Sequence, residues 1–515
     1  MTWLLDVGLW LGGLGLTFLL GAWLLWWGFL GDRSKGRPRC PRCWYLMQGL
    51  PPEATKCPEC GNDARNRRRL LKNRRRWWAM TVGFVLVSPT SYAISVIWTW
   101  SREQSAIASI EYWTDPVSTE SCAPQWLGKR LPPGLLRYYD RAVNIGVLDV
   151  DDAGPRRLTW LRRLRRLVVS NGKFTDSGIE YFFRMPAMQE LRVGSTEISD
   201  VGLARLVEHP ALVALHLDDN HRITDEGLAC LTGLSSLRWL ELDRTNIGDA
   251  GVRHLADLPS LGVLQLNDTA ITDASVRHIL GQLPRMQNLS IGSPGVTDAG
   301  LEHLREAMQL DSLDLSHTSV TGPGLEPIAS QKELTSLILS HTSVDDEGMP
   351  FVAQSAKLQM LELDGSGVGL AGLGALATLN ELTMVSLGSA QLTDSTAEQL
   401  AKIPWLTTVQ LEGEAVDDAA FDRIAGLPML QVVYLVETSI TDEGLSRLFS
   451  RAGIVYLYLE KNALLTESCL ETLRTSTGLS GASFKDNPGI NREAIEALRD
   501  SSPGFDVQAY PRTGQ

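Results

Sequence analysis

The sequence predicts an α/β solenoid, a curved parallel sheet with helices on its convex side, preceded by two transmembrane helices and a small metal-binding loop. Three observations support this. One short phrase recurs about every 24 residues from residue 164 onward, two long segments near the N-terminus are uncharged, and four of the seven cysteines cluster between those segments. A chain of 515 residues is too long for one compact core, which also favours an extended repeat array.

Two segments, residues 7–30 and 77–98, contain no charged side chain. Helices of these lengths would reach about 36 and 33 Å, enough to cross a hydrocarbon layer of about 30 Å. A cleaved signal peptide is the alternative for the first segment, but nothing basic precedes it and its apolar run is long. A buried soluble helix is the alternative for the second, yet arginines 74–76 abut it and it has no polar face. We therefore expect two helices in contact with membrane lipid.

The loop between these segments, residues 31–76, is a basic island in an acidic chain. It holds 14 Lys and Arg against 4 Asp and Glu, whereas the whole chain has a formal net charge of -12. Short basic loops stay in the cytoplasm, so we expect a two-pass protein of the cell (inner) membrane with an extracytoplasmic repeat domain. The arginines at 65–76 could attract nucleic acid, but beside a membrane helix they serve better as topology signals and lipid headgroup contacts.

The cysteine cluster lies in this loop and consists of two CxxC pairs separated by 13 residues, Cys40, Cys43, Cys57 and Cys60. Four thiolates with closed coordination favour structural Zn(II), and Gly61 after the second pair suits a tight metal-binding turn. The segment CPRCWYLMQGLPPEATKCPECG resembles the zinc-ribbon modules of bacterial membrane proteins. Iron in a rubredoxin-like site and a redox-active CxxC pair are the alternatives. The remaining cysteines lie far apart and form no disulfide framework.

The recurring phrase is typified by LRWLELDRTNIGDAGVRHL at residues 237–255. Its LxxLxL part has the alternation of a short strand and its GLxxL part has helical spacing, so each repeat is a strand, a turn and a helix. Stacking places the strands in one concave parallel sheet and the helices on the convex side. About 14 repeats are predicted over residues 164–498, after a linker and N-terminal cap at 101–163 and before a C-terminal tail at 499–515.

Polar residues recur at two fixed places in the phrase. Those that follow the strands can bond backbone groups in the turn: Thr196, Asn220, Thr245, Thr269, Thr318, Thr342 and Thr438. Those that precede the helices are expected N-caps, each followed by an aspartate: Thr224, Thr272, Thr297 and Thr441. The phrase TxITDxGLxxL resembles the cysteine-containing leucine-rich repeats, also seen in ribonuclease-inhibitor-like proteins. That resemblance implies a leucine-rich-repeat solenoid.

Side chains between and just after the strand leucines face the concave side, where a solenoid binds its partner. The candidate partner-binding residues are His216, Asp218, Glu241, Asp243, Asp314, His317, His341, Glu362, Asp364, Tyr434 and Tyr458. Glu412 and Glu460 share this face. These acidic side chains could simply form a solvated polar surface. Alternatively, they could attract a partner with a basic surface. Tyr434 and Tyr458 are expected side by side about 5 Å apart, as are His317 and His341, which we expect to be exposed neighbours and not a metal pair.

No catalytic motif accompanies these positions: the sequence contains no GxSxG, HExxH, P-loop or Gly-rich dinucleotide turn. We therefore expect no enzyme and no small-molecule substrate. The favoured function is a membrane-anchored scaffold or adhesion protein that binds a protein or other macromolecule. The alternative is a transmembrane sensor in which the zinc ribbon docks a cytoplasmic partner.

Overall fold

The structure is a computed structural model of the chain. It describes residues 16–27, 37–40, 42–43, 45–49, 55–63, 77–107, 118–121, 140–148, 151–152, 156, 158–159, 161–170, 172–206, 209, 211–306, 310–388, 394–403, 405–414, 416–424, 426–451, 453–476, 478–501 and 506–509. The chain divides into two compact units, one comprising residues 1–111 and 117–143 and the other residues 112–116 and 144–515.

The first unit contains two apolar helices, Leu16–Trp27 and α3 (Trp77–Ile107), and the short strand β1 (Ser118–Ser121). Among the described residues, one helical segment, Thr81–Gln104, is long and apolar enough to cross a membrane, and the Leu16–Trp27 helix is shorter. The rest of the predicted first span, residues 7–30, lies outside the described residues. The second helix continues beyond the predicted end at residue 98, to Ile107.

The two apolar helices pack at glycines. A Cβ atom on Gly83 of α3 would lie 2.7 Å from the carbonyl oxygen of Gly21, and one on Gly21 would lie 2.9 Å from Cβ of Leu86. Such contacts leave no room for a side chain, so the two backbones approach closely. Small residues at a crossing are typical of helices that associate in lipid.

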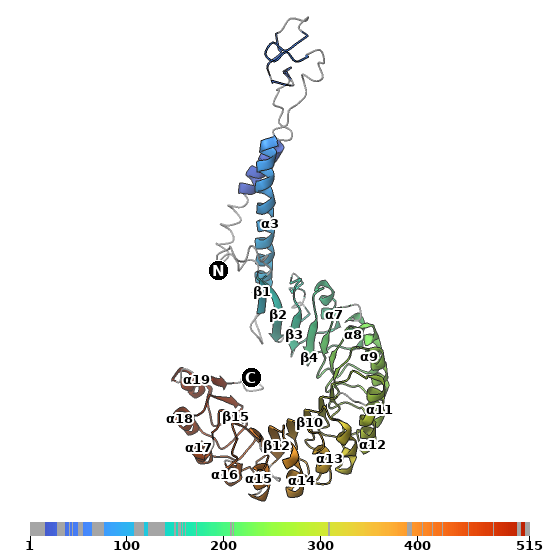
Figure 1. The fold of residues 1–515 in the computed structure, drawn as a ribbon, viewed down its shortest axis with the longest axis vertical. Helices are drawn as coiled ribbons and strands as arrows, with labels where there is room; N and C mark the ends of the chain where they lie inside the picture. The colour runs from blue at the N-terminus through green and yellow to red at the C-terminus, as the bar shows by residue number, and fades with distance from the viewer. Residues whose placement is uncertain are drawn as a thin grey trace. The chain divides into compact units, whose positions relative to one another are not determined.

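The second unit is a curved parallel sheet with helices on one side. Figure 1 shows its strands along the inner, concave side of the arc and its helices along the outer side. The sheet begins in β2 (Asp140–Leu148) and continues through β3 (Arg166–Ser170), β4 (Glu190–Gly194), β5 (Ala214–His216), β6 (Trp239–Glu241), β7 (Val263–Gln265), β8 (Asn288–Ser290), β9 (Ser312–Asp314), β10 (Ser336–Ile338), β11 (Met360–Glu362), β12 (Met384–Gly388), β13 (Thr408–Glu412), β14 (Val432–Val436), β15 (Tyr456–Glu460), β16 (Gly481–Lys485) and β17 (Asp506–Ala509).

Each repeat returns along the convex side through a short helix. The α-helices are α7 (Asp176–Ile179), α8 (Asp200–Leu206), α9 (Asp225–Cys230), α10 (Asp249–Val252), α11 (Asp273–Gln282), α12 (Asp298–Leu301), α13 (Met349–Val352), α14 (Leu370–Ala375), α15 (Asp394–Leu400), α16 (Asp418–Ile424), α17 (Asp442–Arg451), α18 (Ser468–Thr475) and α19 (Arg492–Ser501). The 3-10 helices are η2 (Phe182–Arg184), η3 (Leu231–Gly233), η4 (Arg253–Asp257), η5 (Glu302–Glu306), η6 (Pro323–Ser330) and η7 (Leu376–Thr378).

Consecutive strands from β2 to β17 pair in parallel, in a register set by the strand leucines. Leu337 of β10, for example, lies opposite Leu313 of β9 and Leu361 of β11, and all three are fully buried. Because side chains alternate along a strand, the residues flanking these leucines face the concave side. The core therefore lies between sheet and helices, and the polar face lies on the other side of the sheet.

The polar turn positions act as predicted within a repeat. Thr245 donates from its hydroxyl to the carbonyl of Leu242 at 2.6 Å, and Asn220 donates to the carbonyl of Leu217 at 2.9 Å. Thr224 caps α9 by accepting a hydrogen bond from the amide of Glu226. The predicted role is confirmed for these three residues, whereas Thr196 and Thr438 donate their hydroxyls to the side chains of Asn220 and Asn462 in the next repeat.

The aspartate that opens a helix also connects neighbouring repeats, which the sequence did not reveal. Asp200 of α8 accepts hydrogen bonds from the amide and the hydroxyl of Thr224 in the next repeat, at 2.8 and 2.7 Å. A Cβ on Gly227 would overlap the same carboxylate, so the glycine of the TDxG phrase makes room for it. We call this series of contacts the aspartate ladder, and it recurs at Asp249, Asp273, Asp298, Asp418 and Asp442.

The C-terminal end differs from the predicted tail at 499–515. Asp506–Ala509 form β17, which extends the sheet beside β16, and the guanidinium of Arg499 donates to the carbonyl of Val507 at 2.8 Å. Residues 499–515 contain two prolines and two glycines and lack the leucine phrase, so the pairing of this strand was not predicted. It covers the end of the sheet instead of leaving β16 as an open edge.

Candidate metal centre and candidate concave binding face

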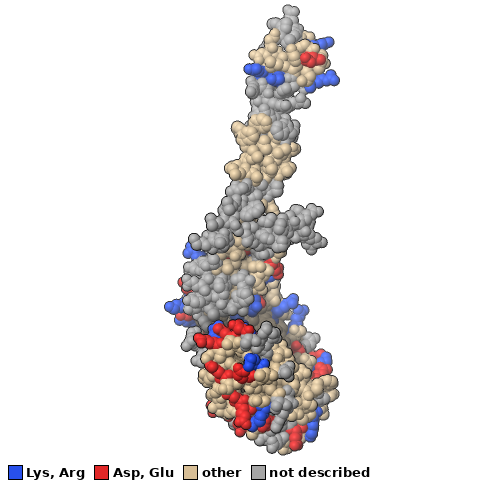
Figure 2. All heavy atoms as spheres, turned by 90° about the vertical axis from the view of Figure 1, so that its left-hand side faces the viewer, with Lys and Arg blue, Asp and Glu red and all other residues tan. Residues whose placement is uncertain are grey.

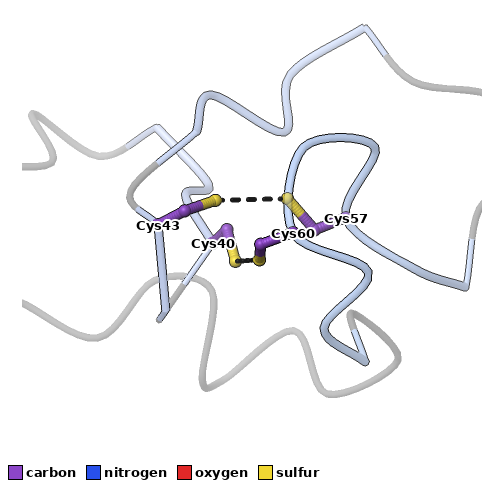
Figure 3. A group of neighbouring side chains, drawn as sticks. All are labelled: Cys40, Cys43, Cys57 and Cys60. Atoms are coloured by element: carbon purple, nitrogen blue, oxygen red, sulfur yellow. Dashed lines mark hydrogen bonds between the residues drawn. The ribbon is translucent and has the colours of Figure 1, made fainter.

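The four clustered cysteines come together as predicted. Their sulfur atoms all lie within 4.8 Å of one another, and Figure 3 shows the four side chains converging from two turns. Sγ of Cys40 lies 3.6 Å from that of Cys60, and Sγ of Cys43 lies 3.5 Å from that of Cys57. Zn–S bonds of about 2.3 Å in a tetrahedron imply sulfur separations of about 3.8 Å. The donor set and its spacing therefore fit one tetrahedral metal ion.

Two similar turns hold these thiols. The amide of Cys40 donates to the carbonyl of Tyr45 at 2.9 Å, and the amide of Cys57 donates to that of Asn62 at 2.8 Å. Gly61 adopts a φ of 69°, a left-handed conformation that glycine takes without strain, as expected for this turn. Burial opposes ionisation of Cys40, but hydrogen bonds to the backbone of Cys43 and Arg42 lower its pKa to about 6.

Charged side chains near the cysteine cluster are mainly basic. Figure 2 shows Lys and Arg on the described part of the loop, and no charged side chain along the helical stretch that it draws in tan. The described basic residues are Arg37, Arg39, Arg42 and Lys56, with Glu59 and Asp63 of opposite charge. The arginine-rich part of the basic island, residues 65–76, lies outside the described residues.

At the N-terminal end of the concave face, predicted acids are paired. His216 Nδ1 lies 2.5 Å from a carboxylate oxygen of Glu241, and Arg192 donates to the same carboxylate at 3.1 Å. Arg192 also lies 3.5 Å from Asp218. Although burial opposes it, the His216 hydrogen bond and the Arg192 charge lower the pKa of Glu241. His216 and Glu241 are buried, so they bind each other more than they face solvent.

Arg192 was not among the predicted site residues. It occupies the strand position that corresponds to His216, directly opposite it in the register of β4 and β5. The same positional rule applied to the weaker repeats at the start of the array would have found it.

The acids in the middle of the array have a different environment. Asp314 accepts hydrogen bonds from Ser290 at 2.6 Å and Asn267 at 3.1 Å, and Asp364 accepts one from Ser386. Burial, together with the charges of Asp364, Asp314 and Glu412, raises the pKa of Glu362 to about 7. Burial likewise raises the pKa of Asp243 to about 6, with a contribution from Glu241. Negative charge thus concentrates around β11.

The tyrosine pair lies toward the C-terminal end of the face. The rings of Tyr434 and Tyr458 stack with centroids 4.2 Å apart and planes 8° from parallel, closer than the predicted spacing of about 5 Å. Both are half-buried, and Tyr456 at the neighbouring strand position is exposed. The pair is a flat aromatic surface, and Val432 and Val436 flank it on the same face of β14.

The two histidines also stack, with ring centroids 4.7 Å apart. His317 and His341 are exposed and have φ angles of 58° and 57°, because both occupy the turn directly after a strand. Among the described residues, the group of side chains that could hold a metal ion is the cysteine cluster, and it does not include these histidines. They are neighbours in adjacent repeats.

These strands, turns and buried leucines define the class of protein: the chain contains leucine-rich repeats. The family model described as Leucine Rich repeat matches residues 209–231 and 309–329. Among curated proteins, none matches the chain.

Two solved structures are similar to this chain in part. An internalin from Listeria monocytogenes is 18% identical over 72% of this chain and 87% of its own, with a TM-score of 0.34. A plant peptide hormone receptor in complex with its ligand is 14% identical over 67% of this chain and 62% of its own, with a TM-score of 0.29.

Proposed function

We propose that the chain is a membrane-anchored protein-interaction protein, a scaffold or adhesion molecule whose concave sheet binds a partner protein. The observation that carries this proposal is the stacked pair Tyr434 and Tyr458 on the concave side of β14 and β15. Tyrosine is enriched at binding hot spots because its ring buries a large area at small entropic cost. A flat, half-buried aromatic pair on the concave face offers a contact area that a partner protein can bury.

The apolar helices and the basic loop support an anchor in the cell (inner) membrane. Thr81–Gln104 has the length and composition of a span, and the crossing at Gly21 and Gly83 is of the kind found between helices in lipid. The excess of Lys and Arg in the loop favours a cytoplasmic loop and an extracytoplasmic repeat domain. Zn(II) is the ion we propose for the four cysteines, in a structural role that orders this loop.

A photo-crosslinking amino acid placed at position 434 tests the binding face in intact cells. Crosslinks to a partner protein are expected from position 434 and not from position 201, an exposed site on the convex helix α8. Partner crosslinks obtained only from position 201 would move the binding face to the convex side.

Topology is tested separately by adding protease to intact spheroplasts. The repeat domain should be digested from outside while the loop at 31–76 is protected. Digestion of the repeat domain only after lysis would place it in the cytoplasm and contradict the proposal of an extracytoplasmic scaffold.

A further inference from the structure

We propose that the centre of the concave face, around Glu362 on β11, binds a lysine or arginine side chain presented by the partner protein. This inference rests on the proposed function, in which the concave sheet is the partner-binding surface. We call the four carboxylates that form this place, Asp314, Glu362, Asp364 and Glu412, the central acidic cluster.

The two ends of the concave face supply their own positive charge. Glu241 near the N-terminal end pairs with Arg192 at 3.1 Å. Glu460 near the C-terminal end pairs with Lys485 at 2.7 Å across neighbouring strands. Glu241 is thus paired with a basic side chain two strands away, and Glu460 with one on the next strand.

The central acidic cluster has no paired Lys or Arg among the described residues, and the basic side chain that acts on it is His341, whose charge acts on Asp364. Within the part of the chain that the structure describes, no Lys or Arg forms an ion pair with any of its four carboxylates. Burial, and after it the negative charges of Asp364, Asp314 and Glu412, raise the pKa of Glu362. Asp314 is satisfied by neutral hydrogen bonds, which leave its charge in place. A cation from outside would remove this repulsion.

A second observation is independent of charge. Asp364 is only 3% exposed, and its Oδ1 atom has no hydrogen-bond partner among the described residues, although Oδ2 accepts from Ser386. Ser340 occupies the corresponding position in the preceding repeat, is 8% exposed, and likewise has an unpartnered hydroxyl. Unsatisfied buried polar atoms cost free energy, so two at one place indicate a group that the isolated chain lacks.

The surroundings suit a long basic side chain. Ser386 of β12 lies beside Glu362 in the strand register, Gly388 lies beside Glu412, and both are small. The side chains of Asp314, Glu362 and Glu412 are half-buried and thus accessible, and the charge of the buried Asp364 acts on Glu362. These carboxylates belong to alternate strands and do not gather into a chelating group as the cysteines do. This spacing favours an elongated cationic side chain over a single metal ion.

The test titrates full-length protein in detergent with a fluorescent peptide of alternating glycine and arginine, and with a glycine and glutamine peptide of equal length. The arginine peptide should bind and the glutamine peptide should not. Glu362→Gln combined with Glu412→Gln should weaken arginine-peptide binding at least tenfold. The matched control, Glu347→Gln combined with Glu443→Gln, changes two exposed acids outside the concave strands and should change affinity less than twofold.

Three results would overturn the inference: equal losses in the two double variants, no binding of the arginine peptide to the wild type, or displacement of the peptide by micromolar Ca²⁺. Equal losses would show attraction to overall charge, and displacement by Ca²⁺ would assign the site to a metal ion. Crosslinking from position 434 would still report a partner on the concave face in each case. Failure of this inference is therefore distinguishable from failure of the proposed function.

Discussion

The carbonyl oxygen of Gly21 lies 2.7 Å from the point that a Cβ atom on Gly83 would occupy, so the two apolar helices touch through their backbones. This contact predicts a specific crosslink. The Cβ of Leu86 is 2.9 Å from the corresponding position on Gly21, close enough for Gly21→Cys with Leu86→Cys to form a disulfide after a small adjustment. Mass spectrometry should find the two peptides joined. Gly21→Cys with Phe84→Cys, an exposed position, is the control, and equal crosslinking of both pairs would contradict this packing.

The aspartate ladder predicts a stability loss that propagates between repeats. Asp200→Ala removes the acceptor for two donors on Thr224 and should lower the free energy of unfolding by about 2 kcal/mol. Glu226→Ala removes an exposed acid in the first turn of α9 and should lower the free energy of unfolding by less than about 0.5 kcal/mol. Urea unfolding of the full chain, followed by circular dichroism, measures both. Equal losses would show that the ladder contributes nothing beyond surface charge.

The tyrosine pair predicts a separation of binding from stability. Tyr434→Ala with Tyr458→Ala should weaken crosslinking to the partner and raise Kd by a factor that corresponds to about 2 kcal/mol or more. The melting temperature should change little, because both rings remain partly exposed to solvent. A large drop in melting temperature with unchanged partner binding would instead make the pair a packing feature.

The central acidic cluster predicts a pH dependence of stability. The pKa of Glu362 is raised to about 7 in the folded chain, so between about pH 4.5 and 7 the folded state binds more protons than the unfolded state. Stability should therefore fall as pH rises through this window. Burial and the negative charges of Asp364, Asp314 and Glu412 raise the pKa of Glu362. The charge of His341 acts in the opposite direction on the pKa of Asp364.

Glu362→Gln tests this dependence, since it removes one of the repelling charges. The melting temperature should rise by roughly 2 °C at pH 8 and stay unchanged at pH 5, where wild-type Glu362 is already protonated. Glu347→Gln is the control for loss of one exposed charge. A pH profile unaltered by Glu362→Gln would remove Glu362 as its cause.

The metal centre predicts that zinc and cysteines are lost together. Purified full-length protein should contain about one zinc per chain, and Cys57→Ser with Cys60→Ser should contain none, because two remaining thiolates cannot close the coordination. Cys230→Ser with Cys469→Ser should retain the metal, since both lie in the repeats. Undiminished zinc in the first variant, or iron in the wild type, would contradict the assignment.

The elements with the strongest sequence signal were the ones that could be predicted. The strand leucines fix both the sheet and its concave positions, because burial of Leu313, Leu337 and Leu361 dictates which neighbours face away. The CxxC spacing likewise identified four sulfurs that do converge. These are local patterns that the chain repeats or concentrates.

Contacts between repeats were harder to foresee. The hydrogen bond from Thr224 to Asp200 joins residues 24 positions apart, and neither residue type alone predicts it. Strand β17 lacks the leucine phrase and is held by pairing with β16. Glu241 is buried beside His216 and Arg192, which lie on the two preceding strands. The pattern within a single repeat therefore predicts only an acid that faces solvent.

The consecutive register of the sheet has a consequence for how this surface can change length. Each strand from β3 to β16 pairs with the strands of the preceding and following repeats, and the ladder contacts span the same interval of about 24 residues. Deleting one whole internal repeat would leave every remaining strand of this interval with a neighbouring strand to pair with. A chain with one repeat more or fewer would thus keep the same strand pairing, while the distance along the sheet between the central acidic cluster and the tyrosine pair would change.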